Sequence, residues 1–315
     1  MVETAPRQSA RIVVIGAGAL GCVFTALLHE SGHQVCIVSR RPDIVKTINT
    51  DGVTVLHRRN DSDGVLRAPV PAFGPGEVIA TGPYDVVMLV NKSMDSEFAV
   101  DLGAQLSGDD GIVVALQNGL RSAEIVEGIP SGVAGVTYQG ATYNHDATVS
   151  WTHVGRTLVA ARPAIADRTA RWVATLSTPS LPWEVASDRD AMLWEKLIAA
   201  ISNSLSGALL QPVFALMRSE SAQQILQRAR SEAFDIAASL GVQLDRTRLE
   251  TAFASGYPSG ADTSGSTFQS LMSGRPTEVG DISGSIADAA AGMGLPAPYN
   301  TALALLVHAR EQLEH

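Results

Sequence analysis

The sequence predicts an N-terminal α/β domain with a doubly wound, mostly parallel sheet, followed by an all-helical C-terminal domain. The chain has 315 residues, about twice the roughly 150 residues that are typical of one domain. In the first half, short apolar runs alternate with helical patterns, which is typical of a parallel sheet with helices on both faces. From residue 189 onward, strand signals almost disappear and helical patterns follow one another.

The composition excludes several classes of protein. Hydrophobic residues make up 45% and charged residues 17% of the chain, which favours a packed core over disorder. The formal net charge of −9, without a long basic run, argues against nonspecific binding to nucleic acid or to an anionic membrane. No stretch reaches the roughly 20 apolar residues of a membrane span, and the N-terminus lacks an apolar signal segment. We therefore expect a cytoplasmic protein.

The cysteines predict neither a disulfide framework nor a metal site. There are two, Cys22 and Cys36, which are too few for a framework and lack the spacing of metal ligands. Cys22 falls just inside a predicted helix, where we expect it to pack as a small apolar side chain.

The expected elements of the first domain follow from short apolar runs and from the glycines that end them. Residues 1–10 are expected to be a flexible lead, and the Rossmann-type domain is expected over residues 11–187. We expect strands at 11–15, 33–39, 84–90, 111–116 and 133–138, a helix at 19–31, a weaker βα unit over 44–64, and paired strands over 148–160.

The second domain, expected over residues 188–315, is helical throughout. Gly- and Pro-rich segments punctuate the helical patterns. We expect helices at 191–210, 219–240, 246–255, 263–272, 277–293 and 299–313.

A GxGxxG motif follows the first predicted strand directly and opens the first helix. It consists of Gly16, Ala17, Gly18, Ala19, Leu20 and Gly21. In such a motif the first glycine makes a tight turn, the second lets the backbone approach a pyrophosphate, and the third allows close packing of helix on strand. The N-terminus of the helix attracts the anion. This context predicts a dinucleotide site, and the alternative is a glycine-rich turn without a ligand.

The end of the second predicted strand indicates which dinucleotide is bound. An NAD site usually has an acidic residue there for the ribose 2′-hydroxyl, whereas this chain has Ser39, Arg40 and Arg41. Arginine forms charge-assisted, bidentate bonds to phosphate. We therefore expect NADP(H), and the alternative is a pair of surface arginines with no ligand.

Polar residues follow two further buried strands. Lys92 comes after residues 84–90, and Asn118 comes after residues 111–116. Because the carboxyl ends of strands in a doubly wound sheet face the ligand crevice, both side chains are expected at the cofactor cleft. The alternatives are a lysine that caps a helix and an ordinary Asn-Gly turn.

Two segments of the helical domain also carry polar residues in a suggestive pattern. Lys196 and Asn203 are seven residues apart, with Ala200 between them, so they share one helix face. The alternative is a lysine that extends its ammonium to solvent. Further along, Gly274 to Glu278 reads as a helix start, with Glu278 near the positive helix end.

Together and in this order, these segments resemble the ketopantoate reductase (2-dehydropantoate 2-reductase) family over nearly the whole chain. The matching segments are Gly16 to Gly21, Lys92, Gln117-Asn118-Gly119, Gly135-Val136-Thr137, His153-Val154-Gly155, Trp194 to Leu197, Ser266 and Gly274 to Glu278.

The resemblance implies a Rossmann domain followed by a helical domain, with the active site in the cleft between them. It implies NADPH-dependent reduction of 2-dehydropantoate to (R)-pantoate in pantothenate and coenzyme A biosynthesis, an oxidoreductase activity on a CH–OH group. By the same resemblance, Lys196 is the catalytic lysine, Asn118 the carbonyl-side asparagine and Glu278 the active-site glutamate. An ammonium near the ketone oxygen stabilises the negative charge that hydride attack creates and can donate the proton.

Further residues match the cofactor and substrate sides of the family's site. Lys92 matches a lysine that serves the cofactor, and Asn118 and Glu278 are expected there too. Ser266 matches a serine that binds the substrate carboxylate, and Asn203 is expected beside it.

The chain also departs from the family pattern. The family has asparagine four residues after the catalytic lysine, where this chain has Ala200, and Asn203 falls one residue short of a second asparagine. Thr263 stands where the family often has asparagine. Loss of such hydrogen-bonding groups changes which substrate is preferred. Two alternatives therefore stay open: a related NADPH-dependent reductase of another 2-oxo acid or ketone, and an NADP-binding regulatory protein without turnover. Apolar helices such as residues 300–307 could pair, which favours a homodimer.

Overall fold

The computed structural model describes residues 9–59, 62–254 and 264–313. The expected flexible lead, apart from its last two residues, and Thr263 lie outside these ranges. The chain divides into two compact units. One comprises Met1–Gln117 and Ser122–Arg189, and the other comprises Asn118–Arg121 and Asp190–His315.

The first unit is built on an eight-stranded sheet with the order β12-β11-β8-β7-β6-β1-β2-β5. β1 pairs in parallel with both β2 and β6, so the chain winds outward from β1 in two directions. The strands are β1 (Arg11–Ile15), β2 (Gln34–Val38), β5 (Ala72–Phe73), β6 (Tyr84–Leu89), β7 (Ser107–Ala115), β8 (Gly132–Thr137), β11 (Thr157–Ala160) and β12 (Trp183–Val185).

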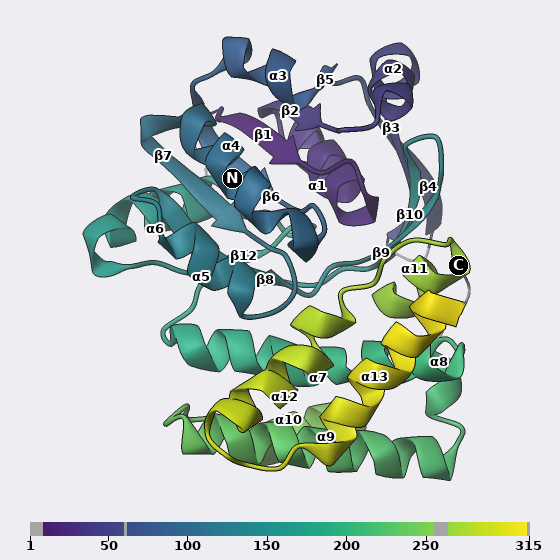
Figure 1. Cartoon of the computed structure of the whole chain (residues 1–315). Coiled ribbons are helices and arrows are strands. Elements are labelled where there is room, and N and C mark those ends of the chain that lie inside the picture. Colours follow the sequence, from purple (N-terminus) through teal and green to yellow (C-terminus); the bar gives the residue numbers. More distant parts are fainter. Residues whose placement is uncertain (1–8, 60–61, 255–263, 314–315) are drawn as a thin grey trace. The chain divides into compact units, whose positions relative to one another are not determined.

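Helices cover both faces of this sheet (Figure 1). Along β1, Ile12 and Val14 pack in one apolar cluster, while Val13 and Ile15 pack in another on the opposite face. This alternation follows from the two-residue period of a strand. The helices are α1 (Ala19–Glu30), α2 (Pro42–Asp51), α3 (Pro75–Val78), η1 (Ile79–Thr81), η2 (Ser93–Asp95), α4 (Ser96–Leu106), α5 (Arg121–Glu127), η3 (Pro163–Ile165) and α6 (Ala166–Leu176).

A second sheet of four strands, which the sequence did not predict, packs against α1. Its strands are β3 (Val53–Arg59), β4 (Ser62–Ala68), β9 (Gly140–His145) and β10 (Thr148–His153), in the order β4-β3-β10-β9. The prediction of a βα unit over 44–64 was therefore wrong, because helix α2 is followed by an antiparallel β3–β4 hairpin. The strands expected to pair over 148–160 also belong to different sheets: β10 pairs with β3 and β9, whereas β11 pairs with β8 and β12.

The second unit is helical and has one apolar cluster of its own. The predicted helix over 277–293 is interrupted at Ile282, whose φ of −106° and ψ of −92° are not helical. No helix in the described part of the chain is long and apolar enough to cross a membrane. The helices are α7 (Arg189–Leu209), α8 (Val213–Leu216), α9 (Glu220–Ser239), α10 (Arg246–Ala254), α11 (Ser266–Met272), η4 (Val279–Asp281), α12 (Ser283–Gly292) and α13 (Pro298–Leu313).

The predicted fold class is thus confirmed: a Rossmann sheet is followed by an all-helical unit.

Candidate functional site

The turn between β1 and α1 has the geometry that a GxGxxG motif requires. Gly16 has a φ of +120°, and a Cβ there would lie 2.6 Å from the backbone nitrogen of Asn91. A Cβ on Gly21 would lie 1.8 Å from the carbonyl oxygen of Gly16. A Cβ on Gly18, in contrast, would meet nothing within 4 Å. The first and third glycines are therefore required by packing, while the second leaves open space.

The N-terminus of α1 fits a pyrophosphate. Gly18 occupies the N-cap position, no side chain caps the helix, and the first turn contains no acidic residue. The first backbone N–H groups of a helix have no intrahelical acceptor, and the helix dipole favours an anion there. Of the other predicted contacts in this turn, Ala17 is buried while Ala19 and Leu20 are half-buried.

The residues expected to bind a 2′-phosphate lie directly after β2. Ser39 is buried, and its Oγ accepts a hydrogen bond of 3.1 Å from the backbone N–H of Arg41. The guanidinium of Arg41 lies 5.6 Å from the ring centroid of Tyr143. Arg40 is exposed and donates to the carboxylate of Asp95, with 2.9 Å between Nη1 and Oδ1. An exposed ion pair contributes only about 0.2–1 kcal/mol, so Arg40 can exchange this partner for a ligand.

The strands β6 and β7 end in polar side chains that contact each other. The Nε2 of Gln117 donates to Oδ1 of Asn91 over 3.2 Å. Gln117 is buried, and its Oε1 has no hydrogen-bond partner among the described residues. Lys92 is half-buried at the N-cap position of η2, next to Asn91. Asn91 was not predicted as a site residue, although its place at the end of a buried strand could have indicated it.

Three predicted site residues meet within the helical unit. The Nδ2 of Asn118 donates to Oε2 of Glu278 over 3.2 Å. Glu278 is buried, and its carboxylate acts electrostatically on the ammonium of Lys196. Burial lowers the pKa of Lys196 to about 8, and the negative charge of Glu278 opposes this shift. The structure therefore brings together an ammonium, a carboxylate and an amide.

Two local features hold this group in place. Gly119 has a φ of +92°, and a Cβ there would lie 2.5 Å from the carbonyl oxygen of Asp281. Only glycine permits this close approach of the Asn118 segment to η4, directly after Glu278. On the other side, the backbone N–H of Thr277 donates to Oε1 of Glu311 over 2.6 Å. The expected helix start at Glu278 is a 3₁₀ turn, and the Glu278 side chain does not cap it.

The remaining predicted substrate residues lie along α7 and α11. A Cβ placed on Gly265 would lie only 2.7 Å from Oδ1 of Asn203. Asn203 is therefore next to the segment that begins α11 at Ser266. Ala200 is buried in the apolar cluster of the unit, with 6% of its surface exposed. It supplies no hydrogen-bonding side chain beside Lys196.

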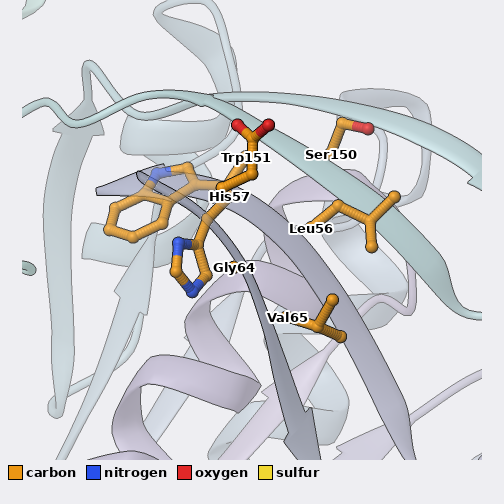
Figure 2. Close-up of a pocket in the computed structure, with 7 residues that line it drawn as sticks. Leu56, His57, Gly64, Val65, Ser150 and Trp151 are labelled. Atoms are coloured by element: carbon orange, nitrogen blue, oxygen red, sulfur yellow. The ribbon is translucent and has the colours of Figure 1, made fainter. Parts of the chain in front are cut away.

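A pocket of about 470 Å³ lies on the four-stranded sheet, shown in Figure 2. The rings of His57 and Trp151 meet edge to face, with 6.4 Å between their centroids. The pocket is lined by Leu56, His57, Asp63, Gly64, Val65, Ser150 and Trp151. None of these was predicted to bind cofactor or substrate, and none belongs to the GxGxxG turn or to the group of Lys196, Asn118 and Glu278. The candidate site therefore does not include this pocket.

Comparison with known families decides the identity of the chain. The model of Ketopantoate reductase PanE/ApbA matches residues 12–164, and the model of its C-terminal domain matches residues 188–311. The chain belongs to the ketopantoate reductase family. A curated family relative, the 2-dehydropantoate 2-reductase of Pyrococcus abyssi, is 24% identical over 307 residues, which cover 96% of this chain and 99% of the relative.

Solved structures share the fold of this chain. A PanE/ApbA family ketopantoate reductase from Ralstonia eutropha JMP134 has a TM-score of 0.82 and 25% identity, and the match covers 97% of this chain and 100% of that one. A D-mandelate dehydrogenase, in a ternary structure with NADH and anilino(oxo)acetate, has a TM-score of 0.87 and 23% identity, with 96% and 99% covered. The protein is therefore a nicotinamide-dependent oxidoreductase that acts on the CH–OH group of a small molecule.

Proposed function

We propose that this enzyme reduces 2-dehydropantoate to (R)-pantoate with NADPH, in pantothenate and coenzyme A biosynthesis. The observation that carries the proposal is the group formed by Lys196, Glu278 and Asn118, in which Asn118 and Glu278 are hydrogen-bonded over 3.2 Å. The name of the curated relative, which matches over 96% of this chain, supports the substrate. We assign residues 11–187 to cofactor binding and residues 188–315 to the substrate and to dimerisation.

In this proposal Lys196 supplies the proton. The reduced nicotinamide supplies a hydride when it is bound. The ammonium of Lys196 stabilises the negative charge on the substrate oxygen and then protonates it. A pKa of about 8 keeps Lys196 charged at neutral pH, yet makes it a stronger acid than an ordinary lysine. An acid with a pKa near the working pH is the more efficient proton donor.

The other residues orient the substrate. Asn118, whose amide is held by Glu278, presents hydrogen-bonding groups to the substrate carbonyl or hydroxyl. We assign the substrate carboxylate to Ser266 and Asn203, because Ser266 lies in the first turn of α11, where an anion is favoured, and Asn203 adjoins that turn.

The choice of NADPH rests on the segment after β2. Ser39, Arg40 and Arg41 offer a hydroxyl and two guanidinium groups at the position where a Rossmann fold meets the ribose 2′-substituent. No acidic residue stands there in the sequence, as NAD sites usually require. Lys92 adds a further positive charge at the end of β6.

A related reductase of another 2-oxo acid is the second candidate, and Ala200 favours it. This side chain is buried among apolar residues and cannot replace the amide of an asparagine. A site that lacks a hydrogen-bonding group loses discrimination in favour of a substrate that needs it. A non-catalytic regulator is disfavoured, because such a protein needs no proton donor with a lowered pKa.

The test is a kinetic comparison of substrates with the purified enzyme. NADPH absorbance is followed with 2-dehydropantoate and with a panel of 2-oxo acids that includes phenylglyoxylate, and NADH is assayed in parallel. The proposal expects 2-dehydropantoate to have the highest kcat/KM of the panel. A higher value for another 2-oxo acid would support the second candidate. Tight NADPH binding without turnover on any member would support the regulator.

We also propose that the chain forms a homodimer through α13. The helix exposes Leu305 and Leu306, at 63% and 55%, and the same patch on a second copy would cover them in a two-fold dimer. In the segment that was expected to pair, residues 300–307, several side chains are instead buried in the core of their own unit. These are Asn300, Leu303 and Val307. Sedimentation of the protein and of a Leu305→Lys, Leu306→Lys variant tests this: a wild-type monomer would refute the proposal.

A further inference from the structure

We infer that Asp95 sets the cofactor preference of this enzyme by competing with the 2′-phosphate of NADP(H) for the guanidinium of Arg40. The inference rests on the proposed NADP(H) site and adds to it a residue that the nucleotide motif does not contain.

The pair spans the phosphate-binding turn. Arg40 follows β2, Asp95 ends η2 shortly after β6, and both strands flank β1, which carries the GxGxxG turn. Nη1 of Arg40 donates to Oδ1 of Asp95 over 2.9 Å, and Nη2 donates to Oδ2. Both terminal nitrogens of the guanidinium are thus engaged by one carboxylate, in the parallel geometry that a phosphate would also use.

The side chain of Asp95 does not cap helix α4. It occupies the N-cap position of α4, where an aspartate usually accepts a hydrogen bond from the first turn of the helix. In this structure the Asp95 side chain makes no capping bond, and its carboxylate contacts Arg40 instead. Removal of its charge should therefore change Arg40 more than it changes α4.

The ion pair between Arg40 and Asp95 affects the binding of NADPH and of NADH differently. A 2′-phosphate needs the same donors of Arg40 that Asp95 occupies, and the carboxylate charge repels the phosphate at close range. The 2′-hydroxyl of NADH carries no charge and does not need the Arg40 donors that Asp95 occupies, so it requires no such exchange. Arg40 is 61% exposed in its side chain, so the exchange of partners needs no unfolding. Asp95 therefore weakens NADPH binding and leaves NADH binding intact.

The experiment measures cofactor affinity directly, without a keto-acid substrate. The Kd values of NADPH and NADH are determined by calorimetry for the wild type and for Asp95→Asn. We expect NADPH to bind about threefold to tenfold more tightly to the variant, while the Kd of NADH changes less than about twofold. Asp101→Asn is the matched control, because it removes the same charge from an exposed position further along α4, and it should leave both affinities unchanged.

Two further variants make the result decisive. Asp95→Ser removes the charge but retains a residue that can cap α4, and it should reproduce the effect if Asp95→Asn is unstable. Arg40→Ala should weaken NADPH binding about tenfold and largely spare NADH. An unchanged ratio of the two Kd values in both Asp95 variants, or weaker NADPH binding in them, overturns the inference. A wild type that binds neither cofactor would instead refute the proposed function.

Discussion

The proposed chemistry depends on Lys196, and two features of its environment shift its pKa in opposite directions. Its neighbours Leu197 and Ile198 are buried, and burial favours the neutral amine. The Glu278 carboxylate favours the ammonium. Burial is the larger effect, so the pKa of Lys196 falls from its usual value of 10.5 to about 8.

This pKa predicts the pH dependence of reduction. The proton donor is charged below pH 8 and neutral above it, so activity should be level at lower pH and should fall about tenfold per pH unit at higher pH. The profile of kcat/KM for the 2-oxo acid at saturating NADPH measures this. Oxidation of the hydroxy acid should show the opposite dependence, because it needs the neutral amine. A profile without a descending limb up to about pH 10 would remove Lys196 as the proton donor.

Substitution of Lys196 tests the same role by another route. Lys196→Ala should lower kcat about 10²–10⁴-fold, the usual contribution of a general acid, while the Kd of NADPH should stay within about twofold. Lys46→Ala, at an exposed position on α2, is the matched control and should retain full activity. Unchanged turnover in Lys196→Ala would contradict the mechanism.

Glu278 should tune Lys196 in a direction that the structure specifies. Glu278→Gln removes the negative charge that raises the pKa of Lys196. The descending limb of the pH profile should therefore move to lower pH, and kcat at a pH near 8 should fall. A limb that moves to higher pH would show that the carboxylate does not act on Lys196 as proposed.

At the scale of elements, the turn after β7 and the 3₁₀ turn η4 must approach each other closely to bring Asn118 to Glu278. Gly119 permits this close approach for two reasons: it adopts a positive φ, and it places no Cβ beside Asp281. Backbone conformation and packing thus impose the same choice of residue.

Gly119→Ala should therefore destabilise the fold and impair the site. A left-handed φ and a clash of 2.5 Å with backbone together should cost about 2–4 kcal/mol in the free energy of unfolding. Gly294→Ala is the matched control, since Gly294 also has a positive φ, of +68°, but nothing lies within 4 Å of its Cβ position. It should cost about 1 kcal/mol and leave kcat unchanged. Equal losses of stability and kcat in the two variants would contradict this account of Gly119.

At the scale of the whole molecule, each unit has an apolar core of its own. The GxGxxG turn, the segment after β2 and Lys92, which make up most of the proposed cofactor site, belong to the first unit, while Asn118 and Glu278 belong to the second. A ligand that binds only the folded state raises stability by about 2.7 kcal/mol at a concentration of 100 times its Kd. For a unit of this size, NADPH should therefore raise the Tm of the first unit by about 5–10 °C.

Gly18→Asp should abolish this shift without lowering the Tm of the free protein. A Cβ on Gly18 would meet nothing within 4 Å, and aspartate is a favoured N-cap residue. Its negative charge, however, would occupy the place of the pyrophosphate at the N-terminus of α1. Scanning calorimetry with and without NADPH measures both effects. A variant that keeps the full shift would place the cofactor elsewhere.

Much of the fold could be predicted because local patterns encode it. Strand β1 is a continuous run of β-branched residues after Arg11, and helix α7 spans 21 residues with a repeating apolar pattern, so the type of each is clear. The second sheet was missed because strands such as β9 and β10 are largely half-exposed, and because partners in this sheet are distant in sequence: β3 pairs with β10, almost a hundred residues later. Periodicity carries no information about such pairings.

The resemblance to the ketopantoate reductase family indicated Lys196 as the candidate proton donor. By itself, the sequence determined the fold class and the GxGxxG turn with its three glycines. These features depend on residue type and on short-range spacing, which a single chain displays directly. Only the tertiary structure decided that Asn118 meets Glu278, 160 residues further along, and that Asp95 engages Arg40, 55 residues away. Such contacts arise when separate elements pack together, and the geometry of that packing, rather than the residues' own neighbours, selects the partners.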